Sequence, residues 1–327
     1  MNILITSAGT RNKVVQAFRK ELAGKGLVIA ADLSNEAPAL YDADKQVLVP
    51  RITAPDYIDC LLSICRKEDV KAVFALIDPE LSLLAKNRDR FLEAGVTPIV
   101  SSYELCELCL DKYAMYERLE QSPFGRAKCW LSEEAFLADR NAGKAAFPVF
   151  IKPRHGSASI EIQKVKDPEL LHVLMKQDPD LMIQELMTGT EYGCDVYIDM
   201  ISHKCTSLFL KKKLRMRAGE TDKSVSVKDP ALFEKAAAFV EDLGFTGMID
   251  IDLFHKEGTD EWILSEVNPR FGGGYPHAYA CGVNFPKYIL ENLSGRENPV
   301  TIGDYEEGIY MMKYNEICVR RSEALCR

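Results

Sequence analysis

The stretch ILSEVNPRFGGG, residues 263–274, is the part of the sequence around which the predicted fold is organised. Residues 263–268 have a period of two, which predicts a β-strand with Glu266 and Asn268 on one face. Pro269 ends this strand because proline has no amide hydrogen to give to a sheet. A second strand is predicted at 247–255 (GMIDIDLFH). The turn-rich segment KEGTDE between the two strands predicts an antiparallel hairpin.

The register of this hairpin brings carboxylates together. If Asp252 faces Glu266, the turn centres on Thr259 and Asp250 faces Asn268. Facing side chains have Cβ atoms roughly 4.5–5.5 Å apart, and two carboxylates at that distance repel unless a cation lies between them. The oxygen ligands Asp252, Glu266 and Asn268 suit Mg²⁺ or Mn²⁺. The alternative is a solvated hairpin face with ordinary surface acids.

The bulk composition limits the function classes. A chain of 327 residues with 47% hydrophobic residues can bury a sizeable core and form two or three lobes. A net charge of −8 argues against a nucleic-acid or anionic-membrane binder, since either needs a basic surface. No apolar run approaches the roughly 20 residues of a membrane span, and no signal peptide is expected. Ten scattered cysteines are expected to be reduced thiols, which indicates a cytoplasmic protein.

The first 100 residues alternate between predicted strands and helices. This order predicts a parallel, doubly wound α/β sheet, with strands at 2–6, 27–31, 70–77 and 96–100 and helices at 12–22, 56–67 and 80–94. Such sheets bind ligands at the carboxyl ends of their strands, which makes Arg11, Asp78 and Glu80 candidate substrate residues. A nicotinamide-binding interpretation is disfavoured, because the segment SAGTRNK has one glycine where the dinucleotide fingerprint needs three.

The middle of the chain carries a candidate phosphate site. The strand FPVFIK, 147–152, ends in Lys152 and is followed by the small-residue loop HGSAS, 155–159, and a strand at 160–165. The backbone amides of such a loop can close over an anion, and Lys152 can pair with a phosphate. The alternative is a flexible turn beside a lysine that reaches to solvent.

Further strands are predicted at 181–186 (LMIQEL), 192–200 and 208–217, the last carrying the one basic run, LFLKKKLRMR. The glycine-containing break after residue 186 can expose backbone groups to a planar heterocycle, and Glu191 can accept bonds from ribose hydroxyls. Residues 219–224 are predicted to form a mobile loop. Residues 230–243 are predicted to form a helix that packs behind the carboxylate hairpin.

The order of these features resembles the ATP-grasp family. The matching features are Asp111-Lys112, FIK at 150–152, HGSAS, IQEL with Glu191, Asp252, and Glu266-Val-Asn268-Pro-Arg270. The resemblance implies a Rossmann-like domain (1–102), then linker helices and a small lobe (103–187), a large lobe with the metal site (188–300) and a tail (301–327). ATP would lie between two antiparallel sheets.

The resemblance also implies roles for individual residues. Lys112 and Lys152 would contact the phosphates of ATP, covered by the loop of His155, Gly156, Ser157, Ala158 and Ser159. The hinge residues Gln184, Glu185, Leu186 and Met187 would border adenine, and Glu191 would bind ribose. Asp252, Glu266 and Asn268 would hold Mg²⁺ or Mn²⁺. Arg270 would stabilise the transferred phosphoryl group, and one or more of Lys211, Lys213 and Arg215 would reach the γ-phosphate.

Within the family, the chain is most similar to one half of the carbamoyl-phosphate synthase large subunit and to small ligases such as the pyrrolysine-forming one. It has one ATP-binding unit where the synthase has two. FGGG follows Arg270 where the synthase has Ser-Arg, and only about 28 residues follow Pro299. We therefore expect Gly273 and Gly274 to shape a pocket for a different substrate.

The expected activity is ATP-dependent carboxylate–amine, or carboxylate–thiol, ligation through an acyl phosphate. Two alternatives remain: synthase-like or kinase-type phosphoryl transfer, and a non-catalytic ATP-binding module. The expected partners are a small carboxylate and an amine, with no nucleic acid and no membrane. A homodimer is compatible with a chain of this size.

Overall fold

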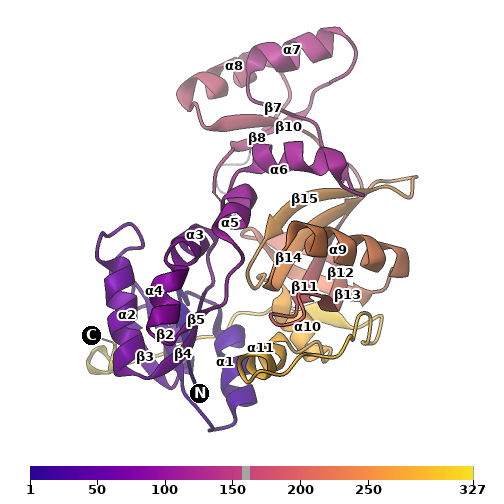
Figure 1. Ribbon diagram of the computed structural model, residues 1–327. Coiled ribbons are helices and arrows are strands. Elements are labelled where there is room, and N and C mark those ends of the chain that lie inside the picture. The colour runs from indigo at the N-terminus through magenta and orange to yellow at the C-terminus, as the bar shows by residue number, and fades with distance from the viewer. Residues whose placement is uncertain (157–162, 327) are drawn as a thin grey trace.

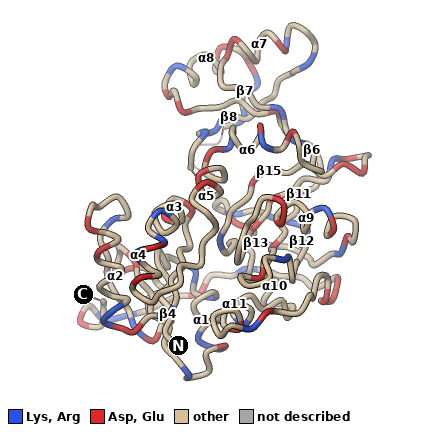
Figure 2. The backbone as a smooth tube through the Cα atoms, in the orientation of Figure 1, with Lys and Arg blue, Asp and Glu red and all other residues tan. Residues whose placement is uncertain are grey.

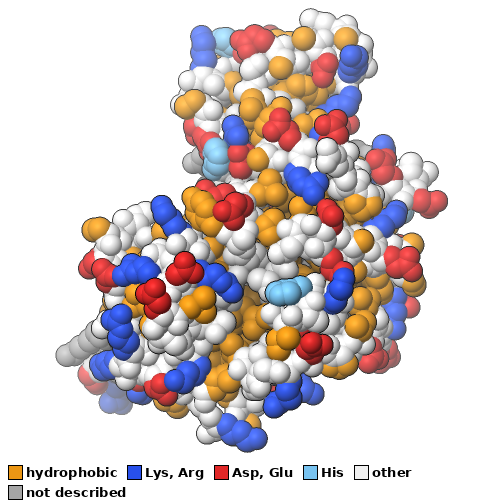
Figure 3. All heavy atoms as spheres, in the orientation of Figure 1, with side chains coloured by type: hydrophobic (Ala, Val, Ile, Leu, Met, Phe, Trp, Pro, Cys, Tyr) orange, Lys and Arg blue, Asp and Glu red, His pale blue; other side chains and the backbone are white. Residues whose placement is uncertain are grey.

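The computed structural model describes residues 1–156 and 163–326. Figure 1 shows three parts: an N-terminal domain, a large lobe beside it, and a small lobe that stands apart at the top of the view. In the space-filling view the molecule narrows between the small lobe and the two parts below it (Figure 3). Basic and acidic residues are interspersed along all three parts (Figure 2). No helix among the described residues is long and apolar enough to cross a membrane.

The N-terminal domain is the predicted parallel sheet. Its strands pair in the order β3-β2-β1-β4-β5: β1 Asn2–Thr6, β2 Val28–Asp32, β3 Lys45–Leu48, β4 Val70–Ala75 and β5 Thr97–Pro98. The helices are α1 Asn12–Leu22, α2 Tyr57–Lys67, α3 Asp78–Lys86 and α4 Arg88–Glu93. Side chains of β1 alternate between the two faces, so that Ile3 and Ile5 join one core and Leu4 the other. Strand β3 was missed because it is short and its first two residues, Lys45 and Gln46, are polar and exposed.

Two linker helices, α5 Tyr103–Leu110 and α6 Lys112–Arg118, lead to the small lobe. The small lobe is an antiparallel sheet of order β7-β10-β8-β9, with β7 Cys129–Trp130, β8 Val149–Pro153, β9 Gln163–Val165 and β10 Leu181–Glu185. Helices α7 Glu133–Asn141 and α8 Pro168–Gln177 cover it and share its separate core. The predicted hairpin on either side of the phosphate loop is therefore confirmed as the pair β8 and β9.

The large lobe contains the hairpin from which the fold was predicted. Strands β14 Gly247–His255 and β15 Trp262–Asn268 are antiparallel, with Asp252 facing Glu266 and Asp250 facing Asn268, as predicted. A register shift follows Asp252, so Leu253 faces Leu264. The hairpin belongs to a seven-stranded sheet of order β16-β13-β12-β11-β14-β15-β6. The added strands are β6 Gly125–Arg126, β11 Thr190–Ile198, β12 Cys205–Arg217, β13 Glu220–Val227 and β16 Tyr310–Met312.

One prediction for this lobe was wrong. Residues 219–224 were expected to be a mobile loop, but residues 220–227 form β13, which pairs with β12 and β16. The glycine and the polar residues suggested a loop, yet Thr221, Ser224 and Ser226 are buried between the two neighbouring strands. The predicted helix is confirmed as α9 Pro230–Leu243, which packs against β11 and β12.

The N-terminal domain and the large lobe share one hydrophobic core. Phe18 of α1 and Phe74 of β4 contact Phe271, which follows β15, with ring centroids 5.9 and 5.6 Å apart respectively. Helix α1 also packs against α10 Tyr275–Ala280 and α11 Phe285–Leu293 of the large lobe. These contacts fix the strand ends of the first domain next to the carboxylate hairpin.

The last part of the chain returns to the first domain. After β16, residues 313–326, which we call the C-terminal strap, run from the large lobe to the N-terminal domain (Figure 1). The ring of Tyr41 lies 5.2 Å from the guanidinium of Arg320, and its hydroxyl accepts a hydrogen bond from the amide of Cys326. Lys13 and Glu316 form an ion pair. The amide of Lys313 donates to the carbonyl of Asp222 in the large lobe, so the strap contacts both parts.

Asp199 anchors the end of β11 inside the large lobe. Its buried carboxylate accepts hydrogen bonds from the amides of Ile201 and Ser202 and from the side chains of Asn292 and Asn298. Burial by itself would raise the pKa of Asp199. The hydrogen bonds outweigh burial and hold this pKa below its usual range.

We expect Asp199→Asn to lower the free energy of unfolding by about 3 kcal/mol, because the new amide turns N–H groups toward donors. A depressed folded-state pKa contributes stability above the unfolded value, and this stability is lost as pH falls. The wild type should therefore lose more stability than the variant between about pH 5 and pH 3. Urea unfolding at several pH values would test this. Asp304→Asn, at an exposed position, is the control. Equal pH slopes for wild type and Asp199→Asn would contradict the prediction.

Candidate active site

A cavity of about 320 Å³ lies where the three parts meet. From the N-terminal domain and linker helices it is lined by Arg11, Asp78 and Lys112, and from the small lobe by Lys152, Gln184 and Met187. From the large lobe it is lined by Glu191, Lys213, Asp252, Glu266, Asn268 and Arg270, together with Gly273 and Gly274. The structure thus gathers these predicted residues, which are spread over more than 260 positions of sequence, into one space.

The carboxylate hairpin forms one wall of this cavity. Lys213 of β12 donates to Asp252 (2.6 Å) and to Glu191 (2.7 Å). Burial, and then the charge of Asp252, raise the pKa of Glu266. The charges of Lys112 and Lys152 act in the opposite direction on this pKa. A cation between Asp252 and Glu266 would relieve the repulsion between these two carboxylates.

The donor set fits Mg²⁺ better than a metal held by protein alone. The described residues contain no group of three or more His, Cys, Asp or Glu arranged to hold a metal. Asp252 and Glu266 face each other instead, and Asn268 lines the same cavity. Mg²⁺ is commonly bound through one or two carboxylates plus the phosphates of a substrate. Asp252, Glu266 and Asn268 therefore suit a nucleotide-linked Mg²⁺ or Mn²⁺.

Two lysines face Glu266 from the other side of the cavity. Lys152 is the penultimate residue of β8 and is buried. Burial lowers the pKa of Lys152 and of Lys112, and the charge of Glu266 opposes this effect at both. Two desolvated cations beside a small-residue loop form an arrangement suited to an anionic phosphate chain.

Asp111 connects the linker helices to the phosphate loop. Its carboxylate caps α6 by accepting from the amides of Tyr113 and Ala114, and it also pairs with Arg154 and His155. The amide of Lys112 donates to the carbonyl of Arg154, and Nζ of Lys112 lies 2.5 Å from the carbonyl oxygen of Gly156. These bonds fix Lys112 at the start of the loop. Ser157, Ala158 and Ser159 lie outside the described residues.

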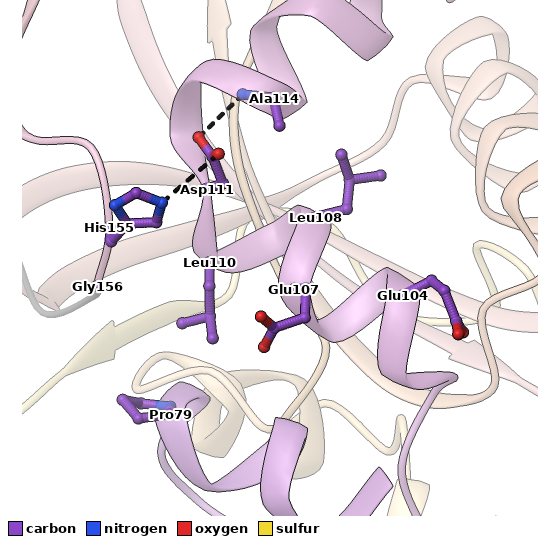
Figure 4. Close-up of a pocket in the computed structure, with 9 residues that line it drawn as sticks. All are labelled: Pro79, Glu104, Glu107, Leu108, Leu110, Asp111, Ala114, His155 and Gly156. Atoms are coloured by element: carbon purple, nitrogen blue, oxygen red, sulfur yellow. Dashed lines mark hydrogen bonds and ion pairs between the residues drawn. The ribbon is translucent and has the colours of Figure 1, made fainter. Parts of the chain in front are cut away.

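His155 and Gly156 line a second, more open hollow. Figure 4 shows Asp111 between the ring of His155 and the amide of Ala114, with Glu107 and Leu110 on the neighbouring turn of α5. Pro79 of α3 closes the opposite side. The hollow therefore lies between the first domain and the linker helices, and the cavity described above is lined by a different set of residues.

The hinge residues divide between the cavity and the surface. Gln184 and Met187 line the cavity, whereas Glu185 is exposed and its carboxylate accepts from the amide of Lys128. The amide of Glu185 donates to the carbonyl of Lys128. Neither Glu185 nor Leu186 is among the lining residues.

The three basic candidates of β12 have different surroundings. Lys213 lines the cavity. Lys211 is buried and paired with Asp195, which is itself buried. The side chain of Arg215 is 64% exposed and lies 3.8 Å from Asp222. The alternation of a strand puts Lys211 and Lys213 on one face, but the register shifts after Lys213, and Met216 rather than Arg215 lines the cavity.

Arg270 is held by the first domain. Its Nε and Nη2 donate to Oδ2 of Asp78 at 3.0 and 2.8 Å, and Nη2 also donates to Oδ1 of Asn268. Asp250 lies 3.9 Å from the same guanidinium. Arg270 is therefore oriented from three sides at the edge of the metal wall.

Glu80 lies apart from the cavity. It is fully buried and accepts hydrogen bonds from the hydroxyls of Ser7 (2.6 Å) and Tyr57 (2.5 Å). Burial raises the pKa of Glu80, and the hydroxyl donors oppose this effect. In the structure this carboxyl group connects β1, α2 and α3, and it is not among the lining residues of the cavity.

Sequence reasoning did not select several charged residues of the site. Glu220 lines the cavity and pairs with Arg11 at 2.7 Å, and Asp195 lies beneath it as the partner of Lys211. Asp250 was placed on the hairpin face but given no role, and it also lines the cavity. Only Asp250 had a local signal, the alternation of its strand. The other two acquire their positions through pairing with distant strands.

Comparisons with known proteins agree with this architecture. Residues 3–99 match the family model "PylC-like, N-terminal domain", and residues 177–317 match "ATP-grasp in the biosynthetic pathway with Ter operon". Two solved structures share the fold. The biotin carboxylase domain of Hydrogenobacter thermophilus 2-oxoglutarate carboxylase, in complex with MgADP, is 15% identical with a TM-score of 0.73 and covers 94% of this chain and 73% of that one. The N5-carboxyaminoimidazole synthetase of Staphylococcus aureus, complexed with ADP, is 14% identical with a TM-score of 0.71 and covers 91% and 78%.

Two curated relatives are similar in sequence. A putative D-alanine–D-lactate ligase of Streptomyces coelicolor is 24% identical over 227 residues, which are 62% of this chain and 65% of that protein. A D-alanine–D-alanine ligase of Corynebacterium urealyticum is 27% identical over 190 residues, 49% and 51% of the two chains. This chain thus spans less than two thirds of the length of each. With both family matches on this three-part fold, the chain belongs to the ATP-grasp superfamily and has a PylC-like N-terminal domain.

Proposed function

We propose that the protein is an ATP-dependent, ADP-forming ligase that joins a carboxylate to an amine, or to a thiol, through an acyl phosphate. The observation that carries this proposal is the cavity in which Asp252, Glu266 and Asn268 face Lys112 and Lys152. A wall that can bind a metal ion, placed opposite two lysines, is suited to a nucleoside triphosphate. Related proteins named as D-alanine–D-alanine and D-alanine–D-lactate ligases support a joining reaction.

The proposed reaction has two steps. A carboxylate oxygen of the substrate forms a bond to the γ-phosphorus of ATP, the bond to the β–γ bridging oxygen breaks, and ADP leaves. The amine nitrogen then bonds to the acyl carbon, phosphate leaves with the bonding electron pair, and the amine loses a proton. Both steps move negative charge between oxygens, so positioned cations supply most of the stabilisation.

The residues of the cavity have separate parts in this scheme. Lys112 and Lys152 would bind phosphate oxygens on one side, and Arg270 would face the transferred phosphoryl group on the other. Mg²⁺ held by Asp252, Glu266 and Asn268 would supply charge neutralisation of the phosphates. Arg270 is already oriented by Asp78, so little reorganisation is needed when charge develops.

Glu266→Gln should lower the rate of substrate-dependent ADP release roughly 100-fold, about 3 kcal/mol of transition-state stabilisation, because one metal-binding carboxylate is removed. The measurement is ADP release from Mg-ATP with pools of carboxylates, amino acids, ammonia and bicarbonate, with EDTA as the metal-free arm. Glu261→Gln, on the exposed turn of the same hairpin, is the matched control and should retain wild-type release. Full activity of Glu266→Gln would rule out the metal assignment. A stable phosphorylated product formed without an amine would indicate phosphoryl transfer instead of ligation.

Replacement of Lys213 should lower the turnover rate more than replacement of its neighbour Lys212. Burial would lower the pKa of Lys213, but Asp252 and Glu191 outweigh this effect and raise it, so the side chain is a fixed cation in the cavity. Lys213→Met should reduce kcat about 100-fold, the usual effect of removing one charge-stabilising donor. Lys212→Met, on the opposite face of β12, is the control. Steady-state kinetics of both variants would test this, and equal rates would refute it.

A further inference from the structure

Three consecutive glycines, Gly272 to Gly274, follow Phe271, and Gly273 and Gly274 line the cavity. A Cβ atom at Gly272 would collide with the carboxylate of Asp250, and one at Gly274 would lie 2.6 Å from Cε of Lys211. A Cβ at Gly273 would lie 2.5 Å from Nη1 of Arg11 and 2.7 Å from Cδ of Glu220. None of the three glycines has a positive φ angle. Glycine is therefore required here for space, which lets charged side chains contact the backbone directly.

Arg11, which pairs with Glu220 next to Gly273, places a positively charged guanidinium at the cavity. Arg11 follows β1 of the first domain, and Glu220 begins β13. Glu220 is held at 2.7 Å by Arg11 and at 2.7 Å by Lys313 of the C-terminal strap. A guanidinium has five N–H donors, and the contact with Glu220 is through Nη1. The remaining N–H groups of Arg11, which lines the cavity, can bind an anion.

Asp78 offers an acceptor. Both hydrogen bonds from Arg270 go to its Oδ2. Its Oδ1 is buried and has no hydrogen-bond partner in the part of the chain that the structure describes. The residue is 95% buried and lines the cavity. A buried carboxylate oxygen in this position requires a donor, and an ammonium group supplies up to three N–H bonds and the opposite charge.

We propose that this end of the cavity binds an amino acid, with its ammonium group on Oδ1 of Asp78 and a carboxylate on Arg11. The inference rests on the proposed ligase function and specifies one of its two substrates. Gly273 is needed for this site because the side chain of a larger residue would displace the Arg11–Glu220 pair. A carboxylate without an ammonium group leaves Oδ1 of Asp78 unpaired, so the site should discriminate against it by at least about tenfold.

The test compares amino acids with their deaminated counterparts. Each of a panel of α-, β- and ω-amino acids is paired with the carboxylic acid of the same skeleton that lacks the amino group. ADP release from Mg-ATP is measured with a mixed pool of amines present. We expect at least one amino acid to stimulate release with a half-saturating concentration at least about tenfold below that of its deaminated partner.

Two variants locate the site. Arg11→Lys should raise the half-saturating amino-acid concentration about tenfold or more, because the planar fork is lost, while that of Mg-ATP stays unchanged. Gly273→Ala should do the same, with melting temperature as the check on folding. Arg19→Lys, an exposed arginine of α1, is the control and should have no effect.

Each result decides between the proposals. Equal stimulation by a deaminated acid would overturn the amino-acid site and leave the ligase function intact. Unchanged amino-acid saturation in Arg11→Lys and Gly273→Ala would also overturn the site. No stimulation by either class, with Mg-ATP still bound, would count against the ligase function, and the inference would fall with it.

Discussion

The ion pair between Asp78 and Arg270 is the interaction on which the rest of the site depends. It joins the first residue of α3 in the N-terminal domain to the residue that follows the metal strand by two positions. Both side chains are buried, so loss of either partner would leave a desolvated charge. Because the same guanidinium also contacts Asn268, the position of the first domain is transmitted to the metal wall. A domain far away in sequence thus completes the chemistry of the hairpin.

Several cationic side chains near the cavity are each paired with at least one carboxylate. Lys211 is paired with Asp195, Lys213 with Asp252 and Glu191, and Arg11 with Glu220. Such pairing offsets the cost of removing each ion from water. Glu266 differs, because it faces Asp252 on the neighbouring strand and finds positive charge only across the cavity. The charge that a nucleotide-bound cation would bring is therefore what this wall needs.

Local sequence patterns were sufficient to predict the hairpin and much of the fold, but they did not predict pairing between distant parts of the chain. The period of two placed Asp252 opposite Glu266, and the alternation of strands and helices gave the parallel sheet. The register shift after Asp252 had no local signal. Residues 219–224 were misread because a glycine and polar residues gave no strand signal, although β13 pairs with β12 and with β16, nearly 90 positions later. Glu220 was missed for a similar reason: its partners Arg11 and Lys313 come from opposite ends of the chain. The assignment of ligand roles remains a prediction.

The C-terminal strap has a mechanical consequence. Because residues 313–326 return to the first domain, the strap adds a second connection between the N-terminal domain and the large lobe, which already share a core. Separating these two parts would require breaking several independent contacts at once. The small lobe has its own core and is joined to the rest through the linker helices and the segment after β10. The small lobe is therefore the part of the described structure that can move as a unit without disturbing the core shared by the other two parts.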